Sequence, residues 1–87
     1  MAMISIAPVA ASVAWDAARA RPTRVRFSDR ELRVTRLAAV RDERAAFPAG
    51  TGPRLRLVVE TDAGEALELI FDARRRRWFV DALDEAA

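Results

Sequence analysis

The sequence contains no cysteine, histidine, lysine or tyrosine. Without cysteine there is neither a disulfide nor a thiol nucleophile, and without cysteine and histidine a structural zinc site is excluded. No serine has a histidine or lysine to activate it, which rules out a catalytic triad or a serine–lysine dyad. Gly50-Thr51-Gly52 lacks the lysine of a phosphate-binding loop. We therefore expect a protein that is not an enzyme and holds no cofactor and no metal.

All 15 basic residues are arginine, and 13 carboxylates oppose them, so the formal net charge is only +2. The isoelectric point is high because no basic side chain titrates before the guanidinium groups do. A high isoelectric point of this origin does not indicate a strongly positive surface. Among the carboxylates, the pairs Asp42-Glu43 and Asp84-Glu85 lie in polar segments where nothing raises their pKa, which argues against general acid–base catalysis.

Apolar and polar residues alternate most clearly between residues 54 and 83. Leu55, Leu57 and Val59 occupy every second position of one stretch, and 67–71 repeats the pattern with Ile70 as an extra apolar residue. A period of two indicates strands with one buried face. With a length that suits one small domain, the pattern predicts an all-β fold of five or six antiparallel strands in sequence order, forming an SH3-like half-barrel.

The turns between these strands determine the register. A three-residue turn at residues 62–64, with Gly64 in the left-handed conformation, sets Val59 opposite Leu67 and keeps apolar residues facing apolar residues. A two-residue turn at Arg74-Arg75 sets Phe71 opposite Trp78 and Leu69 opposite Val80.

In the same register Asp72 faces Arg54 on one neighbouring strand and Arg77 on the other. Opposite charges on adjacent strands attract one another. The register therefore predicts a cross-strand charge triplet on the outer face.

Earlier in the chain, Pro22 opens an extended segment in which Val25 and Phe27 share one face. A polar turn is expected at residues 28–31. In the strand that follows, alternation fails near Thr35, which indicates a bulge or a strand end.

Two interpretations of residues 36–47 stay open. The segment is either a strand that runs into a loop or a short helix, because apolar residues recur there at steps of three and four. Residues 46–53 contain two prolines and two glycines, which predicts a loop.

The first fourteen residues are apolar and uncharged. The run is shorter than the roughly 20 residues of a membrane span, and no basic residue precedes it as in an export signal. We predict a cytoplasmic protein without a membrane partner, with residues 1–12 as an N-terminal arm or edge strand and 13–87 as a single small β domain. The side chains expected to lie on the core are Ile4, Ile6, Val13 and Trp15.

Two surfaces are candidates for binding. The first is basic: a run of arginines before Trp78 suggests a hairpin tip that tracks a phosphate backbone, although a solvated turn is the plainer interpretation. The nucleic-acid candidates are Arg74, Arg75, Arg76, Arg24 and Arg26.

The second candidate surface is apolar and consists of Val58, Ile70 and Phe79, which are out of phase with the core. Apolar residues on an outer face suggest contact with another protein chain or with a second copy in a homodimer. A non-catalytic interaction or assembly module is the leading hypothesis, and a nucleic-acid-binding module is the alternative.

A set of apolar, turn and charged residues recurs in a characteristic order: Val13, Trp15, Asp16, Pro22, Phe27, Arg33, Val34, Thr61, Gly64, Leu69, Phe71, Asp72 and Trp78. Over roughly residues 12–83 this order resembles small uncharacterised bacterial domains of the DUF6504 type. Phe27 and Leu32 depart from the tryptophan and tyrosine usual at those places. The resemblance implies an accessory role beside the Y-family polymerases of DNA damage tolerance, and it implies no catalytic residue.

Overall fold

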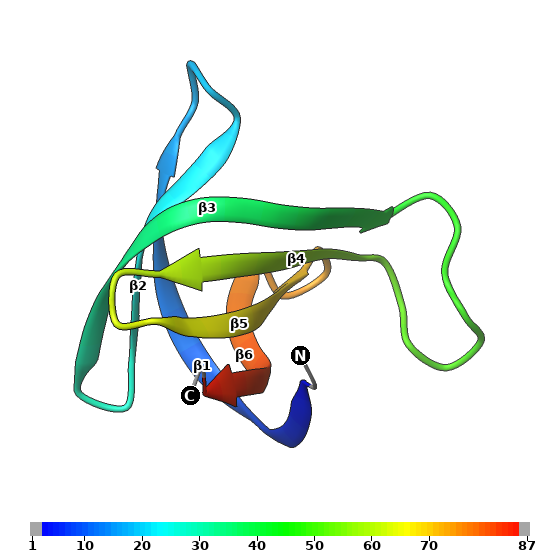
Figure 1. Ribbon diagram of the computed structural model, residues 1–87. Helices are drawn as coiled ribbons and strands as arrows, with labels where there is room; N and C mark the ends of the chain where they lie inside the picture. The colour runs from blue at the N-terminus through cyan, green and yellow to red at the C-terminus, as the bar shows by residue number, and fades with distance from the viewer. Residues whose placement is uncertain (1–2, 86–87) are drawn as a thin grey trace.

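The computed structural model describes residues 3–85, with side chains to residue 84, and shows six antiparallel strands closed into a barrel (Figure 1). The strands are β1 (Ile4–Asp16), β2 (Arg21–Phe27), β3 (Arg30–Glu43), β4 (Arg54–Thr61), β5 (Glu65–Asp72) and β6 (Arg77–Glu85). Each strand pairs with the next, and β1 pairs with β6. The predicted all-β antiparallel meander is confirmed, and it closes fully where a half-barrel was expected.

Two long strands belong to two sheets each. β1 pairs with β6 up to Ala11 and with β2 from Ser12 onward. β3 pairs with β2 up to Arg33 and with β4 from Val34 onward. Because both strands bend from one sheet into the other, the meander closes without a crossover connection.

Bulges in β3 explain its irregular sequence pattern. The register with β4 shifts between Val34 and Arg36 and again between Leu37 and Ala39, which confirms the predicted bulge near Thr35. Each shift adds one residue, so Val34, Leu37 and Val40 all pair with buried residues of β4 at steps of three. A spacing of three residues between apolar positions is also typical of one face of a helix. The helical interpretation of residues 36–47 is wrong, since β3 continues to Glu43 and a loop follows.

The hairpin registers agree with prediction, but the connection between β5 and β6 is a four-residue turn at 73–76 where a two-residue turn was expected. Val59 pairs with Leu67, Phe71 pairs with Trp78, and Gly64 has a φ of 84°. The turn between β2 and β3 is tighter than expected, because only Ser28 and Asp29 lie outside the strands, at φ values of 47° and 61°.

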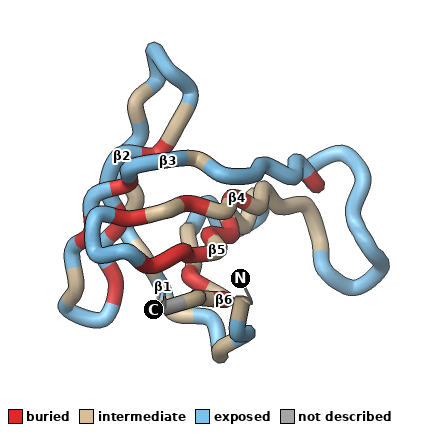
Figure 2. Tube along the Cα trace, in the orientation of Figure 1, coloured by how far each residue is buried: buried red, intermediate tan, exposed pale blue. Residues whose placement is uncertain are grey.

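The core lies between the two sheets, and Figure 2 shows its buried positions concentrated on β4 and β5. Alternate residues of these strands point inward, as their period of two predicts. The largest fully buried side chains are Leu57, Leu67, Leu69, Val25, Val59, Val80 and Pro22.

The N-terminal strand differs from expectation in its side chains. Ile6 and Val13 pack against the core, but Ile4 is 63% exposed and Trp15 is 44% exposed. Residues 4–11 form the part of β1 that pairs with β6. The part of the chain that the structure describes contains no helix of the length and hydrophobicity that a membrane span requires.

Candidate functional site

Three connections lie at one end of the barrel, which we call the loop end. They are the β1–β2 turn (residues 17–20), the β3–β4 loop (residues 44–53) and the β5–β6 tip (residues 73–76). Alternate connections of an antiparallel meander fall at the same end, so the opposite turn end carries the turns at 28–29 and 62–64. Figure 1 shows the β1–β2 turn and the β3–β4 loop projecting away from the barrel.

An aromatic cluster lies at the loop end. Trp15 of β1 stacks on Trp78 of β6, with ring centroids 6.1 Å apart and planes inclined by 27°. Phe71, which pairs with Trp78 across β5 and β6, lies 5.1 Å from it centroid to centroid. Trp15 belongs to one sheet and Trp78 to the other, so the stack joins the two sheets at the edge of the core.

Two of the large exposed apolar side chains belong to this end. Of the four large hydrophobic residues exposed within the described region, Trp15 and Phe47 belong to the loop end, at 44% and 41% exposure, whereas Val40 lies within β3 and Ile4 at the start of β1. Single exposed apolar residues are common on protein surfaces, and of these residues only Trp15 belongs to the aromatic cluster.

Charge is distributed unequally between the two ends. The loop end, taken as residues 15–22, 41–54 and 71–78, carries nine arginines and four carboxylates. The remaining sequence carries six arginines and nine carboxylates. The small net charge of the chain therefore hides an excess of five positive charges at one end and of three negative charges elsewhere.

Most arginines without a carboxylate partner also lie there. Among the described side chains, six arginines make no ion pair within 4.0 Å, and only Arg33 of these lies outside the loop end. An arginine without a carboxylate keeps its donors available for a phosphate or a carboxylate of a partner. The five at the loop end are Arg21, Arg41, Arg74, Arg76 and Arg77.

Asp72 organises the arginine tip. Its Oδ1 accepts hydrogen bonds from the backbone N–H groups of Arg74 and Arg75, at 3.0 and 3.1 Å. Arg54 lies opposite Asp72 as predicted but donates to Glu43 at 2.7 Å. Asp72 also lies opposite Arg77, so the predicted facing of the three charges is confirmed, but among the described side chains neither arginine makes an ion pair with Asp72.

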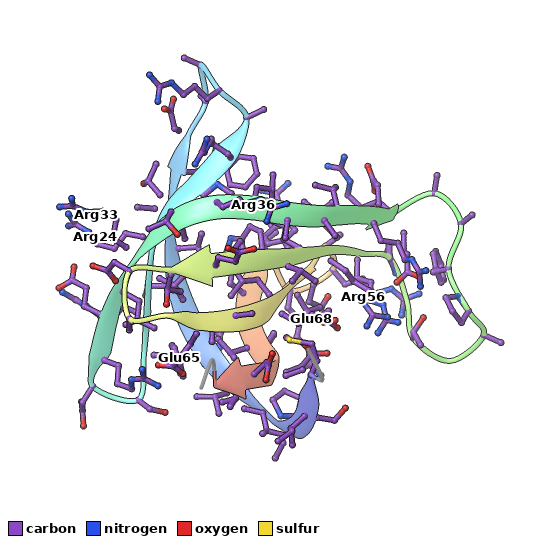
Figure 3. The ribbon with its side chains drawn as sticks, viewed as in Figure 1. Arg24, Arg33, Arg36, Arg56, Glu65 and Glu68 are labelled. Atoms are coloured by element: carbon purple, nitrogen blue, oxygen red, sulfur yellow. The ribbon has the colours of Figure 1, made fainter. Side chains whose placement is uncertain are left out.

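The structure separates the two groups of nucleic-acid candidates. Arg24 and Arg26 lie on β2, on the other side of β1 from β6 and the arginine tip, and both contact Glu31, at 3.4 and 3.9 Å. Arg24 also lies directly opposite Arg33, a like-charge pair that Figure 3 shows extending away from the barrel. Like charges directly opposite destabilise a sheet. The contact between Arg24 and Glu31 offsets part of this repulsion.

The apolar candidates lie on the outer face of β4, β5 and β6. Ile70 is only 9% exposed, and Val58 and Phe79 are half-buried, so they present less apolar surface than the sequence predicts. Ile70 and Phe79 line a groove of about 240 Å³ together with Pro8 of β1. The N-terminal strand therefore covers part of this face.

Sequence reasoning missed an unusual carboxylate beside that groove. Asp81 occupies the register shift between β5 and β6, and its Oδ1 is buried without a hydrogen-bond partner in the described structure. Burial and the nearby charge of Glu68 raise the pKa of Asp81 to about 6. Glu68 itself pairs with Arg56 (Figure 3). The available signal was a lone acidic residue between Val80 and Ala82 in an apolar strand.

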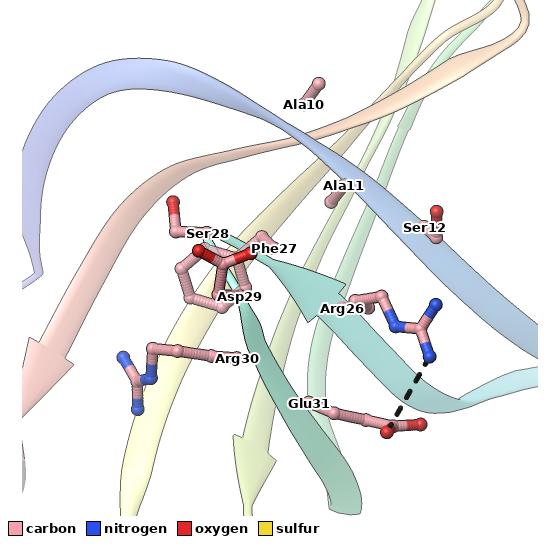
Figure 4. Close-up of a pocket in the computed structure, with 9 residues that line it drawn as sticks. All are labelled: Ala10, Ala11, Ser12, Arg26, Phe27, Ser28, Asp29, Arg30 and Glu31. Atoms are coloured by element: carbon pink, nitrogen blue, oxygen red, sulfur yellow. Dashed lines mark ion pairs between the residues drawn. The ribbon is translucent and has the colours of Figure 1, made fainter.

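A larger hollow of about 590 Å³ lies between β1 and the β2–β3 hairpin (Figure 4). Three of its four charged groups have partners: Arg26 contacts Glu31 at 3.9 Å, and Arg30 pairs with Glu65 while its guanidinium lies 5.5 Å from the centre of the Phe27 ring. The fourth, Asp29, lies in the exposed β2–β3 turn.

The other carboxylates offer little to catalysis or metal binding. Hydrogen bonds from Arg44 lower the pKa of Asp42 to about 2, and Arg54 lowers the pKa of Glu43. Both are therefore ionised at neutral pH and poorly suited to donate a proton. Residues 3–85 contain no group of three or more acidic side chains placed to hold a metal ion.

The chain matches no protein-family model, no curated protein and no solved structure.

Proposed function

We propose that this protein is a non-catalytic binding module that engages nucleic acid through its loop end. The observation that carries the proposal is the unequal charge distribution, with an excess of five positive charges at the loop end of a chain whose net charge is +2. A local positive field attracts a polyanion even when the total charge of the protein is small.

The partners of the arginines support this assignment. At the turn end Arg30 pairs with the buried Glu65, whereas Arg76 and Arg77 on the tip have no carboxylate within 4.0 Å among the described residues. An arginine already held by a carboxylate must lose that contact before it binds a phosphate. The tip arginines bear no such cost, and their forked guanidinium groups suit phosphate oxygens.

Titration of a fluorescein-labelled DNA oligonucleotide at low and moderate salt tests the proposal. We expect affinity to fall steeply with salt, because phosphate contacts release counterions. The variant Arg76→Asn/Arg77→Gln should bind roughly tenfold more weakly at low salt, with a salt slope reduced by about two. Asparagine is chosen at position 76 because it tolerates the φ of 54° there.

A matched control removes the same charge outside the loop end. Arg33→Gln/Arg36→Gln changes two exposed arginines of β3 and should leave the affinity close to that of the wild type. Equal losses of DNA affinity in both double variants would show that binding depends on net charge alone. Absence of binding at low salt would overturn the proposal.

A protein partner is the second candidate function, and the groove beside Asp81 favours it. The floor of this groove contains Ile70 and Phe79, and a buried carboxylate oxygen without a partner lies at Asp81. Light scattering on wild type and Val58→Glu tests whether this outer face joins two copies. If light scattering shows that the wild type and the variant are both monomers, the homodimer is excluded. Val58 is preferred to Ile70 for this test because glutamate in place of the buried Ile70 would disturb folding.

A further inference from the structure

We infer that the nucleic acid bound at the loop end is single-stranded and that one of its bases stacks on Trp15. This inference rests on the proposed function and identifies the class of ligand. It also assigns a role to a residue that sequence analysis placed on the core. The structure instead leaves Trp15 44% exposed while one side of its ring stacks on Trp78.

Local structure orients the Trp15 ring. The register between β1 and β2 shifts between Ala14 and Trp15, which sets Trp15 opposite the fully buried Pro22. Trp78 lies 6.1 Å from Trp15 and is itself in contact with Phe71 at 5.1 Å. A ring that neighbours hold in place loses little conformational freedom when a base stacks on its exposed part.

Arginines adjoin both tryptophans along the chain. Arg21 precedes Pro22, the cross-strand neighbour of Trp15, and Arg77 precedes Trp78. Neither arginine makes an ion pair in the described structure. Successive side chains of a strand point to opposite faces, so Arg21 and Arg77 flank the tryptophans from the other face of their strands. A flexible strand that passes around these strand ends presents a base face to Trp15 and its phosphates to the arginines.

A single strand fits this surface better than two other ligands. In a duplex the base faces are stacked within the helix and unavailable to an indole, so a duplex would use only the arginines. A proline-rich peptide also packs on exposed tryptophan but is often uncharged. The excess of five positive charges at the loop end favours the anionic ligand.

Three labelled probes of equal phosphate number test the inference by fluorescence anisotropy: a pyrimidine single strand, the same strand with abasic sites, and a hairpin duplex. The wild-type protein should bind the intact single strand most tightly. Trp15→Leu should weaken that binding roughly 5- to 150-fold, the range that base–aromatic stacking supports, and make the intact and abasic strands equivalent.

Two further variants separate stacking from damage to the fold. Trp15→Phe keeps an aromatic face and should restore part of the preference for intact over abasic DNA. Phe47→Leu removes another exposed aromatic residue of the loop end and should leave that preference unchanged. Circular dichroism and thermal unfolding identify any variant that is not folded, and the comparison of intact with abasic DNA by wild type then decides alone.

The possible failures are distinguishable. Equal binding of intact and abasic strands by the wild type, or no effect of Trp15→Leu in a folded protein, overturns the stacking inference. The proposed function would survive if Arg76→Asn/Arg77→Gln still weakened binding. Absence of DNA binding at low salt overturns both, and binding of a proline-rich peptide in its place would identify the other occupant.

Discussion

The two ends of this barrel are built from the same six strands but differ in whether their polar side chains have partners within the fold. At the turn end the connections are two or three residues long, and Glu65 is buried against Arg30. The hydroxyl of Thr61 donates to the Glu65 carbonyl, and Asp62 accepts the Arg33 N–H. At the loop end the longest connection has ten residues, and five arginines have no carboxylate partner among the described side chains.

The difference indicates which end of a small domain contributes polar contacts to stability and which end has polar groups available to bind a ligand. A polar group that is satisfied inside the fold contributes to folding and offers nothing to a ligand. Loops on a rigid scaffold are the usual place for binding residues. Three substitutions test whether the two ends divide these roles, in order of the effect expected.

The largest effect is expected in the core that supports the turn end. Leu67 is 0% exposed and pairs with Val59 next to the β4–β5 turn. Leu67→Ala should lower the free energy of unfolding by about 2–5 kcal/mol, because it removes buried apolar surface and leaves a cavity. Urea unfolding measures this loss. Phe47→Leu at the loop end should change stability by less than about 0.5 kcal/mol, and an equal loss in both variants would contradict the division.

The ion pair of the turn end gives an intermediate effect. Arg30→Gln leaves Glu65, whose side chain is only 11% exposed, without its charged partner. We expect a loss of about 1–2 kcal/mol, less than for a fully buried pair because the Arg30 side chain is 41% exposed. Arg76→Asn should lie within about 0.5 kcal/mol of wild type. Restoration of stability in Arg30→Gln/Glu65→Gln would identify the unpaired charge as the cause.

The smallest effect concerns Asp81, which lies outside the loop end and whose buried Oδ1 has no hydrogen-bond partner in the described structure. Its pKa is raised from 3.8 to about 6 in the folded protein, so the folded state binds more protons than the unfolded state between these values. This contribution to stability is complete below pH 3.8 and is lost as the pH rises through 6.

We expect the wild type to lose about 1 kcal/mol of stability from this group between pH 5 and pH 7.5. Asp81→Asn should abolish that loss, whereas Asp62→Asn, which changes an exposed carboxylate of the turn end, should retain it. Thermal unfolding across this pH range makes the measurement. An unchanged pH profile in Asp81→Asn would show that its carboxylate is not the group that titrates.

Much of the strand register was predictable because it depends on neighbours in the chain. The period of two in β4 and β5, with Gly64 in the turn, left one arrangement that paired apolar with apolar residues. The same reasoning found the bulge near Thr35 in β3 but left a strand and a helix open for residues 36–47. Two bulges there place Val34, Leu37 and Val40 at steps of three, and a bulged strand then has the spacing of a helix face.

The candidate site was predictable only in part. The arginine run was visible in the sequence, but Trp15 was assigned to the core because its position continues an apolar strand. Its exposure depends on where β1 bends between the sheets, and its partner Trp78 lies far along the chain. Ile70 was expected on an exposed patch and is instead 9% exposed in a groove that Pro8 of β1 also lines.

The sequence alone determined the phases of the strands, the tight turns and the exclusion of thiol and histidine chemistry, because each follows from residue type or from neighbours within a few positions. Only the tertiary structure decided that β1 closes on β6, that the three arginine-bearing connections fall at the same end of the strands, and that Trp15 stacks on Trp78 with part of its ring exposed. These features join residues separated by most of the chain. Their geometry depends on how the sheets bend and pack, which local patterns do not encode.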